Sequence, residues 1–136
     1  MFQSAPMEYT PLILKAFSSW IIYLGVSHVV RGIKEYLTQT EREKLPSATV
    51  SLMDSQFRFL GGTYIGYGAA LCWTSYDVKE RQLPLNILLA GLALGGIGRA
   101  ISAGVFGWGF PWVRRATITE IAVPPLVYWF GSRKYL

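Results

Sequence analysis

Four segments of the chain are almost continuously hydrophobic, and each approaches the length of a membrane-spanning helix. They cover about residues 11–30, 57–75, 84–106 and 116–131. A helix needs about 20 mostly apolar residues to cross a bilayer, where no water satisfies exposed backbone groups. Helices of a soluble bundle would show polar positions every turn, whereas Leu83 to Leu94 contains Asn86 as its only polar side chain. The pattern therefore predicts an all-α integral membrane protein, an up-down four-helix bundle that forms a single domain over residues 1–136.

The ends of these segments carry local signals. Thr10-Pro11 is a typical helix start, with a capping side chain before a proline at the first helical position. No small-x-small cleavage site follows this segment before Arg31, which indicates a retained helix and not a signal peptide. Pro124-Pro125 interrupts the fourth segment, and because neither residue has an N–H, a kink or break is expected there.

The connections between the segments do not select a membrane orientation. A polar stretch over residues 31–56 follows the first helix, a short charged one over 76–83 the second, and a Trp-rich one over 107–112 the third. With four spans, both termini share one side of the membrane. Basic residues are nearly balanced between the sides, so the positive-inside rule gives no answer; they are Lys15, Lys79, Arg81, Arg133 and Lys134 against Arg31, Lys34, Arg42, Lys44, Arg114 and Arg115.

Two segments place small residues at a spacing of four, in register with an arginine. This spacing puts the residues on one helix face and lets two helix backbones approach closely. We therefore expect these faces to lie at helix–helix contacts, with each arginine pointing towards protein. The two sets are Arg58, Gly62 and Gly66, and Gly91, Gly95, Arg99 and Ala103.

Composition agrees with the membrane prediction and removes several functional classes. Half of the residues are hydrophobic, 15% are charged, and the mean hydropathy is +0.31. The net charge of +5 comes from basic residues scattered singly between apolar segments, which is not the stripe of a nucleic-acid-binding protein. A single Cys and a single His provide neither an internal disulfide nor a metal-ligand cluster. The glycine pairs lack the third glycine of a dinucleotide-binding loop. The sequence therefore predicts no nucleic-acid partner, no metal and no cofactor.

Four titratable side chains, one on each predicted helix, fall at a similar membrane depth. His28 lies in the last turn of the first helix, Arg58 begins the second, Arg99 lies two turns before the end of the third, and Glu120 lies one turn into the fourth. At 1.5 Å per residue they span about 10 Å of depth. Because an isolated charge in a membrane helix is costly, we expect Glu120 to pair with Arg99 and with Arg58.

This polar layer has two interpretations. In one, the charges form an ion-pair network that fixes the register of the helices. In the other, the layer lines a pocket roofed by the long polar connection and the Trp-rich connection. There Glu120 or His28 would move a proton while Arg58 and Arg99 hold an anionic or carbonyl group, which makes these four residues the candidate catalytic set.

The chain resembles the small four-helix membrane proteins of the domain of unknown function 4345 family, which are themselves loosely similar to DoxX-like membrane proteins. The resemblance covers nearly the whole chain. It implies the four-helix fold and supports the Arg/Glu layer, but it supplies no substrate. The residues that carry it are Arg58-Phe-Leu-Gly-Gly62, Gly98-Arg99-Ala-Ile-Ser102 and Thr119-Glu120.

Three functional classes fit a multi-pass protein of this size. A membrane scaffold or pathway-accessory subunit would bind a membrane protein partner or a second copy. A small isomerase- or cyclase-type enzyme would use the polar layer for proton transfer on a lipophilic small molecule, for instance in a natural-product pathway. A transporter or channel would need an oligomer, and no internal repeat in the sequence supports one. Besides the lipid bilayer, the sequence identifies no specific partner.

Overall fold

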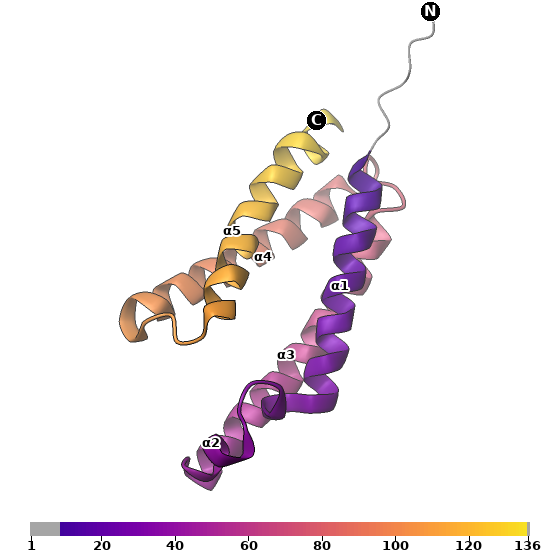
Figure 1. Cartoon of the computed structure of the whole chain (residues 1–136). Coiled ribbons are helices and arrows are strands. Elements are labelled where there is room, and N and C mark those ends of the chain that lie inside the picture. Colours follow the sequence, from indigo (N-terminus) through magenta and orange to yellow (C-terminus); the bar gives the residue numbers. More distant parts are fainter. Residues whose placement is uncertain (1–8, 136) are drawn as a thin grey trace, which may run out of the picture. The chain divides into compact units, whose positions relative to one another are not determined.

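The computed structural model describes residues 9–135, and side chains as far as Arg133. Residues 1–8 of the predicted domain and the Lys134 side chain lie outside this range. Over the described range the chain contains helices and no strand, which confirms the all-α prediction (Figure 1). The helices are α1 (Tyr9–Arg31), α2 (Gln39–Glu43), α3 (Ser47–Thr74), α4 (Gln82–Phe106) and α5 (Pro111–Phe130), with short 3-10 helices η1 (Gly32–Glu35) and η2 (Ser132–Tyr135).

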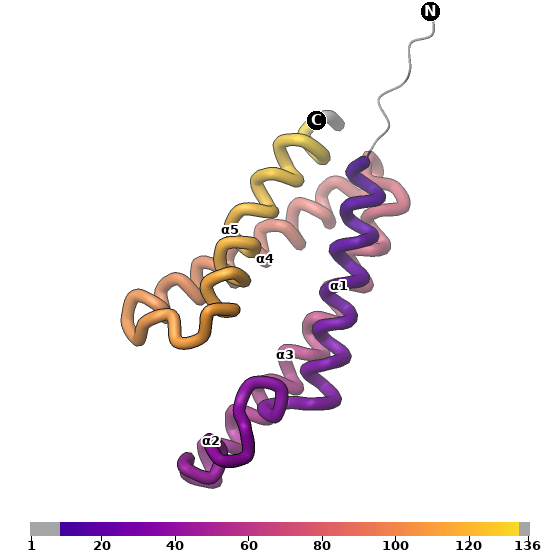
Figure 2. Tube along the Cα trace, viewed as in Figure 1, coloured from indigo at the N-terminus to yellow at the C-terminus, as the bar shows by residue number. Residues whose placement is uncertain are grey.

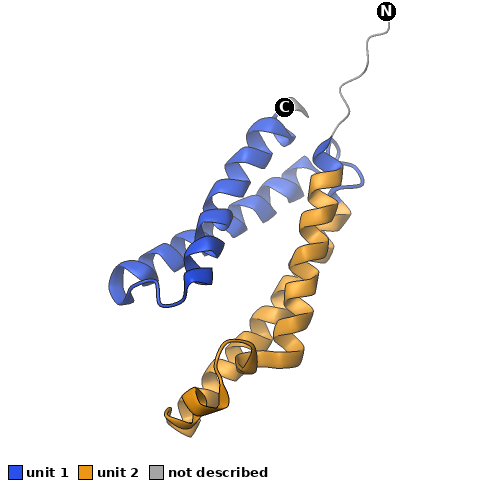
Figure 3. Cartoon of the chain, viewed as in Figure 1, with its two compact units in different colours: residues 1–11, 74–136 blue, residues 12–73 orange. Residues whose placement is uncertain are grey.

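The chain divides into two compact units, which are described separately (Figure 3). Residues 12–73 form the α1/α3 unit, which also contains α2. The residues from Thr74 onward form the α4/α5 unit, together with the first residues of α1.

In the α1/α3 unit, the two long helices lie side by side and run antiparallel (Figure 2). Their backbones approach most closely at three glycines. A Cβ added to Gly61 would lie 2.6 Å from the Gly25 carbonyl oxygen, and one added to Gly68 would lie 2.9 Å from the Ser18 carbonyl oxygen. Nothing lies within 4 Å of an added Cβ at Gly62 or Gly66, so the predicted stripe is not the face that contacts α1. The contact face begins one residue earlier, about 100° around the helix.

In the α4/α5 unit, Gly96 is the glycine at the helix–helix contact. A Cβ added there would lie 2.9 Å from Glu120 Cβ and 2.8 Å from Ile121 Cγ1, whereas Gly91 and Gly95 face open space. The glycines of the predicted stripe on α4 are therefore also off the contact face of its unit, whereas Arg99 of the same stripe reaches Glu120 across the contact. Small residues still let the helices approach, as expected for helices that pack in lipid, but at a neighbouring position.

Helix boundaries agree with the sequence where the helix is wholly apolar and differ where it is not. The predicted helices at about 11–30 and 84–106 match α1 and α4 within two residues. Helix α3 begins at Ser47 and not at about 57, since its polar first turns also form a helix, with the Val50 N–H donating to the Pro46 carbonyl at 3.1 Å. Helix α5 begins at Pro111 and not at about 116, with a proline in its first turn where no N–H is needed.

The Pro124-Pro125 pair does not end α5, so of the two predicted outcomes the break is wrong and the kink stays a prediction. Proline has a fixed φ close to that of a helix, which allows the helix to continue through both residues. The two prolines still remove the N–H donors that the carbonyl groups of Glu120 and Ile121 would otherwise bond four residues later. The hydrogen-bond ladder of α5 is thus weakened directly after Glu120.

Among the described residues, two helical segments are long and apolar enough, by length and composition, to cross a membrane. They are Tyr9–Glu35, whose most apolar 18-residue stretch has a mean hydropathy of 1.5, and Gln82–Phe106, where this value is 1.6. Most of their large hydrophobic side chains are exposed, which gives support for membrane association.

Candidate functional site

The polar groups of the α1/α3 unit gather where α1 ends and the chain reverses. Gly32 directly follows α1 and has a φ of +56°, a left-handed conformation that is unfavourable for residues other than glycine. A Cβ at this position would also overlap Asp54 Oδ1. Gly32 therefore turns the chain so that η1 folds back beside the last turn of α1.

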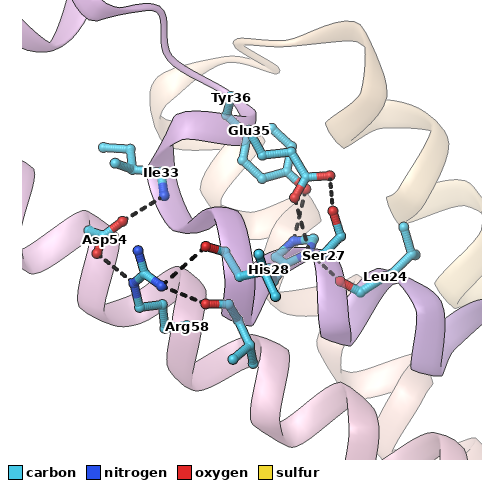
Figure 4. Close-up of polar contacts among 10 residues, drawn as sticks. Leu24, Ser27, His28, Ile33, Glu35, Tyr36, Asp54 and Arg58 are labelled. Atoms are coloured by element: carbon cyan, nitrogen blue, oxygen red, sulfur yellow. Dashed lines mark hydrogen bonds and ion pairs between the residues drawn. The ribbon is translucent and has the colours of Figure 1, made fainter.

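Arg58 and Asp54, both on α3, hold this reversal in place (Figure 4). Arg58 Nε donates to Asp54 Oδ2 at 2.7 Å, and its Nη1 donates to the Val29 carbonyl at 2.5 Å. The other carboxylate oxygen, Asp54 Oδ1, accepts the Ile33 N–H at 2.9 Å. The last carbonyl groups of a helix have no partner within it, so the guanidinium group of Arg58 caps the end of α1.

The same contacts perturb Asp54, which lies before the apolar part of α3. Its hydrogen bond with Arg58, followed by the one from the Ile33 N–H, holds the pKa of the Asp54 carboxyl below its ordinary value. Both partners stabilise the carboxylate form, so this capping arrangement depends on a charged Asp54.

His28 is buried within the last turn of α1 and uses both ring nitrogens. Nδ1 lies 2.7 Å from the Leu24 carbonyl oxygen, which can only accept, so Nδ1 carries a proton. Nε2 lies 2.8 Å from the Tyr36 hydroxyl, which donates to it when the imidazole is neutral. The rings of Tyr36, Phe57 and Tyr64 surround the imidazole with centroids 5.4, 5.9 and 5.6 Å away.

Glu35 completes this cluster from η1 (Figure 4). Its Oε1 accepts the Ser27 hydroxyl at 3.0 Å. Its Oε2 is buried without a hydrogen-bond donor and lies 3.8 Å from His28 Nδ1. A protonated His28 would therefore find a carboxylate beside one nitrogen and a hydroxyl beside the other. We refer to Ser27, His28, Glu35 and Tyr36 as the His28 cluster.

In the α4/α5 unit, Arg99 and Glu120 form an ion pair across the two helices. Arg99 Nε lies 3.0 Å from Glu120 Oε2 and 3.2 Å from Oε1. The two side chains are 26% and 14% exposed. The guanidinium carbon of Arg99 also lies 5.8 Å from the ring centroid of Trp112. Gly96, one turn before Arg99, lets α5 approach closely enough for this pair to form.

The structure thus brings Arg99 and Glu120 together, and places His28 and Arg58 in the other unit, around the end of α1. The single layer of four residues stays a prediction, because each pair is described within its own unit. The acidic partner of Arg58 within its unit is Asp54, four residues earlier on the same helix.

Three residues of these clusters were not identified from the sequence: Glu35, Tyr36 and Asp54. The spacing of Asp54 and Arg58 is a recognised signal for a pair on one helix face. The glycine that ends α1 is the signal that Glu35 and Tyr36 turn back towards His28.

A hollow of about 660 Å³ adjoins the Arg58–Asp54 pair. It is lined by residues of η1, α2 and α3, so part of the long polar connection covers it, and its charges are mixed. They are Lys34, Arg42, Glu43, Asp54 and Arg58. Within residues 9–135, no group of three or more His, Cys, Asp or Glu side chains could hold a metal ion.

Comparison with known proteins identifies a family. The family model for a domain of unknown function, DUF4345, matches residues 10–130, which is nearly the whole chain. No curated protein and no solved structure matches the chain. The chain belongs to the DUF4345 family.

Proposed function

We propose that this DUF4345 protein crosses the bilayer with α1, α3, α4 and α5 and serves as a membrane scaffold or pathway-accessory subunit. The observation that carries the proposal is that large apolar side chains are exposed while small polar ones are buried, the reverse of the distribution in a soluble protein. On α4, Leu94 and Val105 are 67% and 69% exposed, whereas the polar residues Ser18 and Thr74 are fully buried. Exposed apolar surface on this scale is unfavourable in water and is matched by lipid.

Helices α3 and α5 have the length needed to cross, although they are less apolar than α1 and α4. At 1.5 Å per residue, the 28 residues of α3 extend about 42 Å and the 20 residues of α5 about 30 Å. The hydrocarbon core is about 30 Å thick. Arg58 is the only charged residue over 57–75, and Glu120 is compensated by Arg99. Both helices can therefore cross without an unpaired charge at the centre.

The contacts of the charged side chains support a scaffold over a catalytic role. Arg58 caps the end of α1, and Arg99 and Glu120 join α4 to α5. Each of these side chains fixes the position of a helix, and none needs a ligand to be satisfied. The outward apolar faces are then left for lipid and for a membrane protein partner.

Membrane topology can be mapped directly, because Cys72 is the only cysteine. In a Cys72→Ser background, single cysteines would replace the exposed residues Thr40, Lys79, Trp108 or Arg133, and intact vesicles would be treated with a membrane-impermeant maleimide. Four spans require Thr40→Cys and Trp108→Cys to be labelled from one side, and Lys79→Cys and Arg133→Cys from the other. Labelling of positions 40 and 79 from the same side would exclude α3 as a span.

The His28 cluster favours a second candidate, a small membrane enzyme that transfers protons on a lipophilic substrate. A buried imidazole lies between a hydroxyl group and a carboxylate that has an unused oxygen, and these group types are compatible with general acid–base catalysis. In this candidate, Tyr36, His28 and Glu35 would relay the proton, and the predicted set of Glu120, Arg99 and Arg58 would hold the substrate or stabilise charge.

The two candidates differ in what a conservative substitution does in the native host. Tyr36→Phe, His28→Gln and Glu120→Gln would be expressed in a strain lacking the gene, with Tyr23→Phe at an exposed tyrosine as the control. Membrane-inserted protein and lipid-soluble metabolites would be quantified in each strain. A scaffold predicts that metabolite levels follow the amount of inserted protein. An enzyme predicts that one metabolite disappears while the protein remains at its normal level.

A further inference from the structure

A second hollow, of about 500 Å³, lies between the Trp-rich connection and the first turns of α5. Arg114 and Arg115 both line it. Both residues are exposed, and neither side chain has a hydrogen bond or ion pair with another described residue. They differ in this respect from Arg58 and Arg99, whose guanidinium groups are engaged within the protein.

The charge of this hollow is uncompensated. None of the described residues that line it is acidic. The nearest acidic residue along α5, Glu120, is bound to Arg99 and so contributes no net negative charge to this end of the unit. Arg114 and Arg115 therefore leave a local charge of two positive units, which favours an anionic ligand. Arginine suits a phosphate oxygen pair in particular, because its planar group offers two parallel N–H donors.

The remaining lining is apolar and aromatic. Trp108 and Phe110 border the hollow on the connection, and Ile118 lies one turn further along α5 than Arg114. Aromatic rings beside basic residues at the end of an apolar helix are typical of the headgroup level of a bilayer. A ligand that fits both the basic and the apolar parts of this lining carries an anionic group at one end and a hydrocarbon chain at the other.

We propose that this hollow binds the phosphate headgroup of an anionic membrane lipid. Arg114 and Arg115 bind the phosphate oxygens, Trp108 and Phe110 border the glycerol region, and the acyl chain lies along Ile118. The shared chemistry is a phosphate anion, and the apolar lining selects lipid over free phosphate. The assignment rests on the proposed membrane function, since the headgroup must lie at the level where α5 enters the bilayer.

The test uses the full chain in detergent, titrated separately with phosphatidylglycerol and phosphatidylcholine, with bound lipid counted by native mass spectrometry. The wild-type protein should bind phosphatidylglycerol preferentially. In the Arg114→Gln/Arg115→Gln variant the preference should fall about tenfold or more, because the charge-assisted hydrogen bonds of both guanidinium groups to the phosphate are lost. Arg114→Lys/Arg115→Lys keeps the charge and should retain part of the preference. The matched control is Arg31→Gln/Lys44→Gln, which removes the same charge from exposed positions on the same predicted side and should keep the wild-type preference.

Two further measurements separate the outcomes. Flotation with liposomes reports membrane insertion of every variant, and inorganic phosphate is added as a competitor. Wild-type protein that fails to insert overturns both the membrane function and this site. Normal insertion with no lipid preference, or with equal losses in the glutamine variant and its control, overturns the site alone. Displacement of phosphatidylglycerol by an equal concentration of inorganic phosphate would mean that the lipid is not the ligand.

Discussion

The α1/α3 unit and the α4/α5 unit each contain an arginine close to a helix contact, and they use it differently. Arg58 lies beside the end of α1, where it binds backbone carbonyl groups and the carboxylate of Asp54 on its own helix. Arg99 lies beside the middle of α5, where it binds Glu120 across the contact. Backbone acceptors are free at a helix end and occupied in its interior. The position of an arginine along the neighbouring helix therefore decides whether it caps that helix or pairs with one of its side chains.

The two units also differ in what their glycines touch. Gly61 faces backbone atoms of α1, and an added Cβ would lie 2.6 Å from the Gly25 oxygen and 2.7 Å from the Val29 nitrogen. Gly96 faces mainly side-chain carbons of Glu120 and Ile121. Backbone atoms cannot move aside without shifting a whole helix, so the α1/α3 contact should be the less tolerant of the two.

The largest expected effect is at Gly61. Gly61→Ala should lower the free energy of unfolding by about 3 kcal/mol, because the new methyl group overlaps the backbone of α1. Gly62→Ala, one residue later, meets open space and should raise it by up to about 1 kcal/mol through helix propensity. Unfolding of the purified protein by SDS titration in mixed micelles measures both. Equal changes at the two positions would contradict the observed contact face.

A smaller effect is expected from the ion pair of the α4/α5 unit. Glu120→Gln should lower the free energy of unfolding by about 2 kcal/mol, since breaking a fully buried pair costs about 3–5 kcal/mol and this one is partly exposed. Arg58→Gln should cost about 1 kcal/mol, because the Arg58 side chain is 43% exposed.

A double-mutant cycle with Arg99→Gln and Glu120→Gln isolates the interaction across the two helices. A coupling of about 1–2 kcal/mol is expected for a direct contact of this kind. The pair formed by Arg58→Gln and Glu120→Gln is the comparison. Strong coupling there would mean that the predicted four-residue layer forms, and its absence would leave the two arginines independent.

The smallest expected effect is a pH dependence confined to the α1/α3 unit. Because the pKa of Asp54 is lowered in the folded protein, its contribution to stability is fully present above the ordinary Asp pKa of about 3.9. This contribution is lost as the pH falls through the lower pKa of the folded state. Asp54→Asn should therefore be less stable than wild type at neutral pH and converge with it in acid. A constant difference across this range would exclude the carboxylate as the capping group.

The sequence alone predicts the apolar helices well, since an uninterrupted run such as Leu83 to Leu94 leaves few alternatives. It does not predict the start of α3, because the turns after Ser47 are polar and hydropathy identifies only apolar segments. The predicted glycine stripes were displaced by one position. A spacing of four identifies a face, but Gly61 and Gly68 are seven residues apart and lie on a neighbouring face.

The candidate site was predictable to a similar extent. Glu120 is the only acidic residue in a predicted span, which limits its partners, and Arg99 lies beside it. Hydropathy alone places Arg58 in the same layer, because the pattern covers only the apolar segments. Its acidic partner, Asp54, lies just outside that segment, and the reversal at Gly32 that brings Glu35 to His28 depends on backbone conformation.

The separation of Arg99 and Glu120 along the chain has a consequence for biosynthesis. Glu120 is made 21 residues after Arg99, which at about 5–20 residues per second is a delay of about 1–4 s. In the proposed topology, α4 therefore reaches the translocon with an arginine whose partner has not yet been synthesised. An uncompensated arginine opposes insertion by about 2.5–3.5 kcal/mol at the helix centre. The most apolar 18-residue stretch of α4 has a mean hydropathy of 1.6, against 1.5 for that of the segment containing α1, and the leucine-rich first half of α4 offsets the cost of the charge until α5 is inserted.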